Sequence, residues 1–387
     1  MKKFLALFSL ILISSFSFAQ LSQFNYVHDG QDRSYFLYLP ANIQPGSPLV
    51  FVLHGYTSSA EGIIDDYGMN EVADANGFAV CYPQGSQDLT GTNFWNIKFP
   101  LETVDDVGFL SNLAEDLQSM YDLDANCTYV SGMSNGGMMS YYLGCERPDI
   151  FKSIASVTGT ITSNFISDCG GNISVPFMQI HGTSDIVVPY NGGNIAQATF
   201  GEFFPVEQII RTWTGINDCQ SISTFSVPNA PVIDFSSVAG AEVSDCDGGL
   251  KAKFYRIDGG GHTWPGSPPI PFVDFLQPTN QDINASQEIW NFFSSVCSPS
   301  NGIAEEEVSL VEERINLFPN PSYGDINLEY YGGSKATLTV MTVEGRVVLQ
   351  ERISEGRNYL PMHHLDKGFY LAQVKGNQDH VIKFILE

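Results

Sequence analysis

Short apolar runs that alternate with helix-like segments constrain the fold of this chain more than any other feature. Between residues 21 and 297, runs such as "PLVFVLHG", "GFAVCYPQG", "CTYVSGMS" and "VPFMQIHG" have too few polar residues for strands with one face in water. They are typical of strands buried on both faces, as in a mainly parallel sheet. Helix-like stretches separate several of them, over 105–123, 136–146, 207–216 and 286–296. The alternation predicts an α/β fold with a mainly parallel sheet flanked by helices.

The first twenty residues, MKKFLALFSLILISSFSFAQ, have the three parts of a secretory signal peptide. Lys2 and Lys3 give a positive start, residues 4–13 form a short apolar segment, and residues 17–19 offer a small-x-small cleavage site. We therefore expect residues 1–19 to be removed on export. No later run reaches about 18 uninterrupted apolar residues, so no membrane span is expected in the mature protein.

Export to an oxidising compartment favours disulfide bonds among the seven cysteines. An odd number leaves at least one thiol unpaired. We expect that thiol to be Cys81, because "GFAVCYPQG" has the pattern of a buried strand, where a lone cysteine behaves as a small hydrophobic residue. Cys219 and Cys246 bracket a polar insertion and form the one pair that the sequence suggests. The other pairings stay open.

The composition changes near residue 298. Residues 298–312 combine turn formers with an acidic run that has no hydrophobic period, which is typical of a linker. Beyond it, residues 313–387 contain no cysteine and carry strand-like runs between Gly, Asn and Asp turns. We predict an α/β catalytic domain over residues 20–297 and a small all-β sandwich over 313–387.

The balance of charges excludes two classes of partner. Eighteen basic residues against 43 acidic ones give a net charge of −25. Such a surface repels nucleic acid and anionic lipid, so neither is expected to bind.

No cluster of cysteine and histidine has the spacing of a zinc site, so we expect neither a metal nor another cofactor.

The stretch "YVSGMSNGGMMS" places Ser134 between Gly132 and Gly136. Alone, G-x-S-x-G is weak evidence, since on the order of one chain in three of this composition would contain it by chance. Here an apolar strand precedes the motif and a helix-like segment follows it, which is the context of a nucleophile elbow. In such a turn the glycines let strand and helix pass closely, and the serine Oγ is exposed at the carboxyl edge of the sheet. Ser134 is therefore the predicted nucleophile.

A serine nucleophile needs a histidine base and an acid that orients the base, in the chain order Ser, acid, His. Asp185 follows the apolar strand in "VPFMQIHGTSDIVVPY", and His262 lies in a glycine-rich loop after the last strand, in "AKFYRIDGGGHTWPG". Both residues stand where the order requires them. Three rival acids do not follow the strand that precedes the histidine strand: Asp168, Asp218 and Asp258.

Two backbone N–H groups are predicted to bind the developing oxyanion. One belongs to Asn135, which follows the nucleophile, and the other to Tyr56, or alternatively Thr57, in the loop after "LVFVLHG". Trp95 and Trp264 are candidates for substrate binding, in the wall of an acyl or alcohol pocket. Packing inside the protein is an equal alternative for both rings.

Four other ionisable residues have structural interpretations. His54 and His181 each precede a glycine at a strand end, outside the triad order, so we expect hydrogen bonding rather than base catalysis. Asp105 and Asp106 are expected to be a helix cap and its solvated neighbour rather than a pair of catalytic carboxylates. None of the four enters the predicted site.

Four motifs resemble a known family. "LHGYTSSA", "GMSNGGMMSYYLGCERPDIF", "IHGTSDIVVPY" and "DGGGHTWPG" are similar to those of secreted esterases grouped with polyhydroxybutyrate depolymerases and feruloyl esterases. The resemblance covers roughly residues 30–297. It implies an α/β-hydrolase fold, a triad of Ser134, Asp185 and His262, and hydrolysis of carboxylic esters.

The C-terminal segment resembles a type IX secretion sorting domain (type A). "LFPNPSYGDINL", "VEGRVVLQ" and "LDKGFYLAQV" carry this resemblance. It implies passage through the periplasm and outer membrane by the type IX machinery, usually with removal of the tail. The protein is then expected to be released outside the cell or attached to the cell surface.

Together these features predict an exported serine esterase that acts through an acyl-enzyme. Its expected substrates are feruloyl or acetyl esters of plant polysaccharide, or a polyester of the polyhydroxyalkanoate type. A serine peptidase of the prolyl-oligopeptidase type is one alternative, but that class usually adds a propeller domain, for which this chain has no room. A non-catalytic glycan-binding surface protein on a hydrolase scaffold is another, but that class usually lacks a triad member.

Overall fold

The computed structural model describes residues 19–99, 102–162, 165, 169, 175–193, 202–269, 277–296 and most of 314–386. The chain divides into two compact units, residues 1–302 and 303–387, and each is described here by itself. The predicted signal peptide over 1–19, apart from Ala19, and the predicted linker over 298–312 lie outside the described residues.

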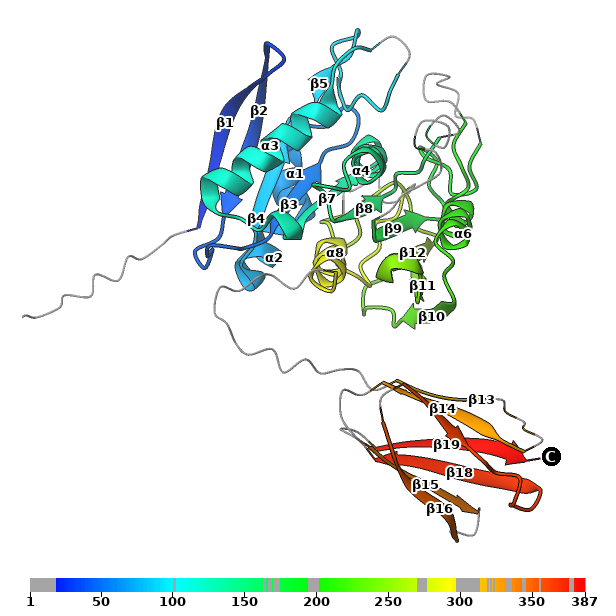
Figure 1. Ribbon diagram of the computed structural model, residues 1–387. Coiled ribbons are helices and arrows are strands. Elements are labelled where there is room, and N and C mark those ends of the chain that lie inside the picture. Colours follow the sequence, from blue (N-terminus) through cyan, green and yellow to red (C-terminus); the bar gives the residue numbers. More distant parts are fainter. Residues whose placement is uncertain are drawn as a thin grey trace, which may run out of the picture. The chain divides into compact units, whose positions relative to one another are not determined.

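The N-terminal unit is a ten-stranded sheet with helices on both faces (Figure 1). In sheet order the strands are β1 (Gln20–His28), β2 (Gln31–Leu39), β4 (Ala79–Pro83), β3 (Leu49–Leu53), β7 (Thr128–Met133), β8 (Ser153–Val157), β9 (Phe177–Gly182), β12 (Ala252–Asp258), β11 (Ser237–Ser244) and β10 (Ser221–Val227). The helices are α1 (Ala60–Tyr67), α2 (Met69–Asn76), α3 (Asp106–Tyr121), α4 (Asn135–Glu146), α6 (Val206–Ile216) and α8 (Ala285–Ser294). Short elements complete the unit: β5 (Ser86–Gln87), β6 (Asn93–Phe94), and the 3-10 turns η1 (Ala125–Cys127) and η2 (Asp247–Gly249).

The six central strands, from β4 to β12, run parallel, which confirms the predicted fold class. Every residue of β3, β4, β8 and β9 is buried. Successive side chains of a strand point to opposite faces, so one strand serves two cores. Phe51 joins the core that includes residues of α3, α4 and α6, and Val52 joins the core that includes residues of α1, α2 and α8. This burial on both faces explains why the apolar runs lack alternation.

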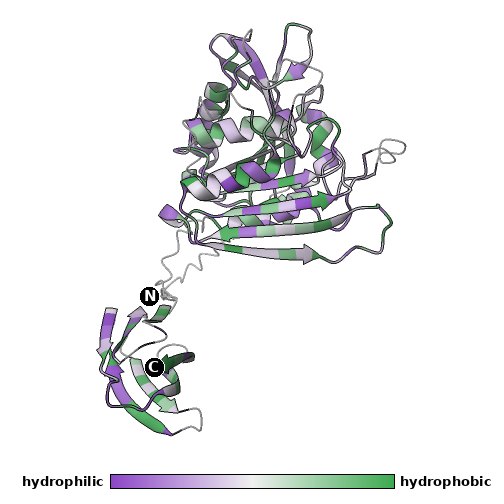
Figure 2. Cartoon of the chain, turned by 90° about the vertical axis from the view of Figure 1, so that its right-hand side faces the viewer, coloured by the Kyte–Doolittle hydropathy of each residue, from purple (hydrophilic) through white to green (hydrophobic). Residues whose placement is uncertain are grey.

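The two edges of the sheet are antiparallel and were only partly predicted. β1 pairs with β2 on one side, and β11 and β10 extend the sheet beyond β12 on the other. β1, β10 and β11 were not recognised from the sequence, because strands with solvent on one or both faces carry many polar residues; β10 contains no buried residue. Figure 2 shows how hydrophilic and hydrophobic residues mix along the strands of this unit.

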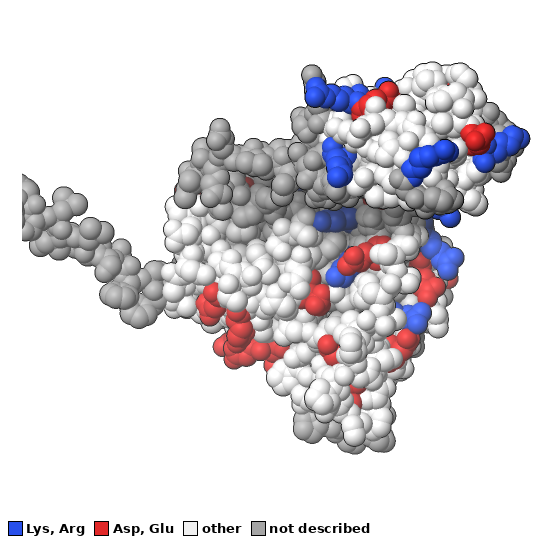
Figure 3. Space-filling model, turned by 90° about the horizontal axis from the view of Figure 1, so that it is seen from below, with Lys and Arg blue, Asp and Glu red and all other residues white. Residues whose placement is uncertain are grey.

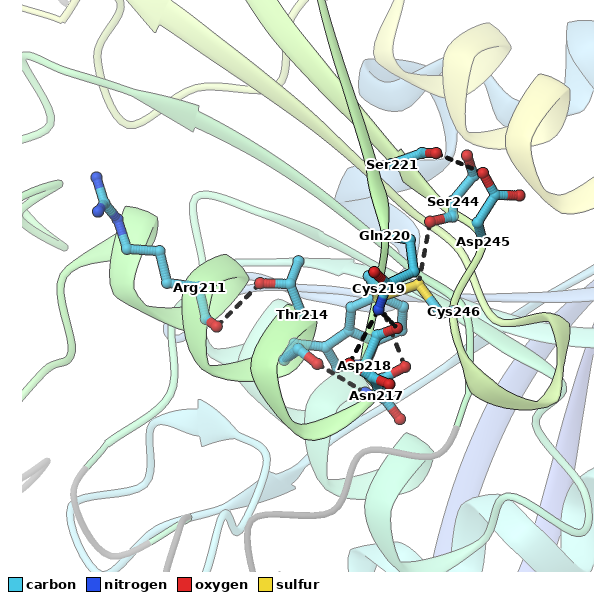
Figure 4. The surroundings of a disulfide bond; sticks show 11 residues. Arg211, Thr214, Asn217, Asp218, Cys219, Gln220, Ser221, Ser244, Asp245 and Cys246 are labelled. Carbon is cyan, nitrogen blue, oxygen red and sulfur yellow. Dashed lines mark hydrogen bonds between the residues drawn. A yellow bond between two sulfur atoms is a disulfide. The ribbon is translucent and has the colours of Figure 1, made fainter. Parts of the chain in front are cut away.

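Disulfide bonds reinforce the periphery of the sheet. The predicted bond between Cys219 and Cys246 is confirmed (Figure 4). It joins the loop after α6 to the loop after β11. Cys145, in α4, is bonded to Cys169, and Cys127 is disulfide-bonded as well. Cys81 is the expected free thiol, buried in β4, and burial raises its pKa well above the usual value.

The C-terminal unit consists of two antiparallel sheets, which confirms an all-β fold for this part of the chain. One sheet contains β13 (Arg314–Phe318), β14 (Ile326–Tyr331) and β17 (Gly356–Leu360). The other contains, in order, β16 (Val347–Ile353), β15 (Ala336–Thr342), β18 (Gly368–Lys375) and β19 (Asp379–Leu386). A single core takes residues from both sheets, for example Leu328, Val340 and Phe384. β13 and β17 were not predicted.

Charged side chains of both signs reach the surface. On the face drawn in Figure 3, acidic side chains are scattered over the surface, and the basic ones do not merge into one continuous patch. None of the helices in the described part of the chain is long and apolar enough to cross a bilayer.

A buried ion pair joins the edge strand β2 to α3, and it corrects one expectation. Asp105 does cap α3, accepting the N–H of Gly108 at 2.8 Å. Asp106, however, is buried rather than solvated, and its Oδ1 lies 2.6 Å from Nη2 of Arg33. Its Oδ2 accepts the N–H of Asn96 at 2.7 Å. Burial raises the pKa of Asp106, and the Arg33 guanidinium offsets this only in part.

Removing Arg33 is expected to destabilise the fold strongly. Arg33→Met leaves the Asp106 carboxylate buried without a cation, which typically costs about 3–5 kcal/mol. The double variant Arg33→Met/Asp106→Leu should recover most of this loss, because no charge then remains buried. Urea unfolding of the three proteins measures the effect. As a matched control, Asp149→Ala breaks the exposed pair with Arg147 and should cost less than about 1 kcal/mol. Equal losses from the buried and exposed pairs would contradict the account.

Candidate active site

β7 passes into α4 through a tight turn at Ser134. The backbone of this residue has φ 56° and ψ −120°, a combination that residues other than glycine rarely adopt. The N–H of Ser134 donates to the carbonyl of Val157 at 2.8 Å, and its own carbonyl accepts the N–H of Met138 at 2.9 Å. Its side chain makes no capping hydrogen bond to the helix that follows. The turn therefore holds a strained serine whose hydroxyl is not used by the cap.

The flanking glycines are required by the close packing of this turn. A Cβ at Gly132 would lie 2.5 Å from the carbonyl carbon of Gly136 and 2.9 Å from Cβ of Leu53. A Cβ at Gly136 would lie 2.4 Å from the carbonyl oxygen of Leu53. The atoms that these Cβ atoms would meet are backbone atoms or the Cβ of Leu53, so no side-chain rotation relieves the clash. Strand β7 and helix α4 thus press directly against β3.

The structure brings Asp185 and His262 together across 77 residues of sequence. Asp185 follows β9 and His262 follows β12, and these strands are parallel neighbours, so their carboxyl ends meet at one edge of the sheet. Nδ1 of His262 lies 2.7 Å from Oδ2 of Asp185. The backbone N–H of His262 donates to Oε1 of Gln277 at 2.7 Å, which fixes the loop that carries the ring. Gln277 had no signal in the sequence.

Asp185 is buried, and its oxygens are held by several donors. Oδ1 accepts the backbone N–H groups of Val187 and Val188, each at 2.8 Å. Oδ2 also lies 3.4 Å from Nε2 of His181. Burial is the largest influence and would raise the pKa of Asp185, but the hydrogen bonds from His181 and His262 together lower it below its ordinary value. The carboxylate is therefore ionised across the neutral range.

His181 supports this carboxylate from inside the sheet. It is fully buried, and its Nε2 lies 2.9 Å from the carbonyl oxygen of Val188. Its Nδ1 faces the side-chain nitrogen of Gln179 at 3.0 Å, so Nδ1 accepts and Nε2 carries the hydrogen. The hydroxyl of Tyr141 in turn donates to Gln179 at 2.6 Å. The structural role expected for His181 is present, and it includes a contact to Asp185 that the sequence did not indicate.

The three rival acids do not replace Asp185. Asp258 is paired with Arg256 at 3.0 Å, and Asp218 accepts a hydrogen bond from Gln220 at 3.0 Å. Asp168 lies outside the described residues. Among the described aspartates, Asp185 is the one that contacts His262.

Trp95 and Trp264 pack inside the protein, which is one of the two alternatives that the sequence left open for them. Trp95 is fully buried, and its indole N–H donates to the carbonyl of His54 at 2.9 Å. Trp264 is 3% exposed and stacks on Tyr67 with ring centroids 4.1 Å apart. Its indole N–H donates to Ser286 at 3.2 Å. Because both rings are enclosed, the geometry favours the alternative in which they pack inside the protein.

Asn135 and the loop after β3, which carry the predicted oxyanion donors, lie next to Ser134. Asn135 begins α4, and its side chain is engaged elsewhere: it accepts the N–H of Trp95 at 2.7 Å and donates to the carbonyl of Trp95 at 3.0 Å. A Cβ at Gly55 would lie 3.4 Å from Cβ of Ser134, so the residue before Tyr56 lies against the turn at Ser134. The N–H of Thr57, the alternative donor, donates to the carbonyl of Asn93 at 3.0 Å.

His54 is a structural histidine, as expected. It is fully buried, its Nδ1–H donates to the carbonyl of Gly55 at 2.8 Å, and its Nε2 accepts the N–H of Gly85 at 2.9 Å. Burial lowers the pKa of His54 to about 4, against a smaller opposing effect of the hydrogen bond to Gly55. The neutral ring thus joins two loops at the carboxyl edge of the sheet.

Comparisons with known proteins agree with this geometry. Residues 33–189 match the family model "Esterase PHB depolymerase", and residues 316–387 match "Secretion system C-terminal sorting domain". The chain is 26% identical over 265 residues to the bifunctional acetylxylan esterase/xylanase XynS20E of Neocallimastix patriciarum, covering 68% of this chain and 33% of that protein. It is 27% identical over 221 residues to feruloyl esterase B of Piromyces equi, covering 56% of this chain and 39% of that protein. It is 35% identical over 148 residues to the poly(3-hydroxybutyrate) depolymerase of Ralstonia pickettii, covering 34% of this chain and 30% of that protein.

A parallel sheet with a strained serine between strand and helix, and an Asp–His pair at the same edge, defines an α/β-hydrolase. The N-terminal unit is a carboxylic ester hydrolase, similar over residues 33–189 to polyhydroxybutyrate depolymerases and to feruloyl esterases. The C-terminal unit is the secretion sorting domain that the sequence suggested, so the protein is extracellular or attached to the cell surface. The chain spans about a third of the length of the three relatives named above.

Adding one methyl group at the elbow is expected to disrupt the site. Gly136→Ala forces a Cβ into the backbone of β3, and it should lower kcat/KM for a nitrophenyl ester by about 100-fold or more, since shifts near 1 Å have such effects. Gly215→Ala is the matched control. Gly215 lies in α6 with no atom within 4 Å of an added Cβ, so activity should be unchanged and stability equal or higher by up to about 1 kcal/mol. Similar losses in both variants would contradict the argument.

Acid is expected to destabilise the fold through His54. The unfolded residue binds a proton below about pH 6.5, whereas the folded one binds it only near pH 4, so stability is lost as pH falls through this window. The full loss from this residue is about 3 kcal/mol. His54→Gln should be less stable at pH 7.5 but should lose less on acidification, as measured by urea unfolding from pH 7.5 to pH 4. Parallel pH curves for the two proteins would count against this assignment.

Proposed function

We propose that the protein is a secreted serine esterase with Ser134 as nucleophile, His262 as general base and Asp185 as orienting acid. The observation that carries the proposal is the 2.7 Å hydrogen bond between Asp185 and His262 at the sheet edge where β7 presents Ser134. The strained backbone of Ser134 supports it, because such strain persists where a function requires it. The esterase relatives support the same chemistry.

The proposed reaction has two halves. Nε2 of His262 takes the proton of Ser134 Oγ as this oxygen attacks the ester carbonyl carbon. The N–H groups of Asn135 and Tyr56 stabilise the negative oxygen of the tetrahedral intermediate, and each such donor typically contributes about 10²–10³ in turnover. The C–O bond of the ester then breaks, and His262 returns its proton to the leaving alcohol. Water repeats the steps on the acyl-enzyme and releases the acid.

Asp185 has two roles in this scheme. Its hydrogen bond to Nδ1 of His262 holds the tautomer in which Nε2 is free to accept a proton. Because its pKa is lowered, Asp185 stays ionised and stabilises the imidazolium that forms during the reaction. His181 and the N–H groups of Val187 and Val188 keep the carboxylate oriented.

We propose feruloyl or acetyl esters of plant polysaccharide, or a polyhydroxyalkanoate-type polyester, as the substrate class. The relatives are named for these three chemistries, and no single one is favoured by the residues described. A panel of methyl ferulate, acetylated xylan, polyhydroxybutyrate film and nitrophenyl esters of increasing chain length separates them.

We also propose how the protein reaches its location. The signal peptide over residues 1–19 would direct export to the periplasm, and the sorting domain over residues 313–387 would engage the type IX secretion machinery. The match of residues 316–387 to a secretion sorting domain supports the second step.

Loss of the Ser134 hydroxyl is expected to abolish hydrolysis. Ser134→Ala should lower kcat for 4-nitrophenyl acetate by on the order of 10⁵ or more, because removing a nucleophile removes the covalent route. Ser131→Ala is the matched control. Ser131 lies in β7, the strand that precedes Ser134, and its buried Oγ has no hydrogen-bond partner among the described residues, so activity should stay within about twofold. An active Ser134→Ala variant would end the proposal.

A further inference from the structure

His28 presents a buried nitrogen with no hydrogen-bond partner, at the turn between β1 and β2. The residue is 8% exposed, and its Nε2 is buried and makes no hydrogen bond within the described part of the chain. Oδ2 of Asp29 and Oδ2 of Asp105 face this nitrogen at 3.7 and 3.6 Å, beyond hydrogen-bond distance. Buried polar atoms normally have a partner, so this arrangement needs a physical explanation.

The three donor atoms have the spacing of a metal site. They all lie within 4.8 Å of one another. A tetrahedral Zn²⁺ with bonds of about 2.0–2.1 Å holds its ligand atoms roughly 3.4 Å apart. The two nitrogen–oxygen separations of 3.6 and 3.7 Å exceed this by a few tenths of an ångström. The carboxylate side chains of Asp29 and Asp105 are 76% and 55% exposed, so small rotations can close the gap.

Local structure positions Asp105 and His28. Asp105 uses Oδ1 to cap α3, which leaves Oδ2 directed toward His28. A Cβ at Gly108 would lie 2.1 Å from this Oδ2 and 3.1 Å from Nε2 of His28, so the glycine keeps the space beside both donors open. The imidazole packs near the ring of Phe109 at 6.1 Å between centroids. The donors therefore converge from two separate places, the β1–β2 turn and the N-cap of α3.

We propose that His28, Asp29 and Asp105 bind a Zn²⁺ ion, which links the β1–β2 turn to the start of α3. An imidazole nitrogen with two carboxylates suits zinc, whereas calcium and magnesium prefer oxygen ligands alone. The two carboxylates provide the negative charge that the cation needs. The neighbouring guanidinium of Arg33 is neutralised by Asp106 and does not oppose binding. The sequence predicted no metal because Asp105 lies 77 residues after His28 and 76 after Asp29, and such a distance forms no recognisable motif.

Calorimetric titration with ZnCl₂ tests this site. The mature protein, purified without a histidine tag, should bind one ion per chain, and the ion should raise the midpoint of thermal unfolding. His28→Gln should weaken binding by about 100-fold or more, because loss of a ligand exceeds the 10–100-fold effect of outer groups. Asp29→Asn and Asp105→Asn should do the same while the fold is kept. Asparagine tolerates the φ of 50° at position 29 and caps helices as well as aspartate does.

Asp32→Asn is the matched control. Asp32 is exposed in the same hairpin and contributes no donor to the cluster, so its loss should change the affinity by no more than about twofold. The proposal is overturned by any of three results. These are no saturable zinc binding, full binding retained in Asp29→Asn and Asp105→Asn, or an equal loss in Asp32→Asn, which would indicate diffuse attraction to an acidic surface.

Discussion

The close passage of β7 and α4 against β3 is the constraint on which the geometry of the proposed active site depends. Gly132 and Gly136 leave no room for a Cβ, and the carbonyl of Leu53 lies where a side chain at Gly136 would project. This contact forces Ser134 into a backbone conformation that costs on the order of 1–3 kcal/mol. Burial of β3 and β7 on both faces supplies the stability that keeps the strain in place.

The parallel order of the central strands does the rest of the positioning. β7, β8, β9 and β12 are neighbours in that order, so the residues that follow β7, β9 and β12 share one edge of the sheet. Ser134, Asp185 and His262 each occupy such a position, although 128 positions separate the first from the last. Buried polar groups behind this edge, above all His181, hold the Asp185 carboxylate in its orientation.

Much of this arrangement could be predicted from the sequence, for identifiable reasons. Strands buried on both faces leave continuous apolar runs, and the elbow leaves glycines at fixed positions, so the fold class and the position of Ser134 were accessible. The edge strands β1, β10 and β11 carry polar residues and were missed. The burial of Trp95, Trp264 and Asp106 could not be foreseen either, because each depends on contacts with residues distant in the chain.

The account depends most on a covalent acyl group carried by Ser134. Rapid acid quenching during turnover of 4-nitrophenyl acetate, followed by peptide mass spectrometry, tests this directly. The account predicts one acetyl group per chain, on the peptide that contains Ser134, formed in a burst before steady-state release of nitrophenol. A burst with the acetyl group on another residue, or steady hydrolysis with no acetylated peptide, would contradict it.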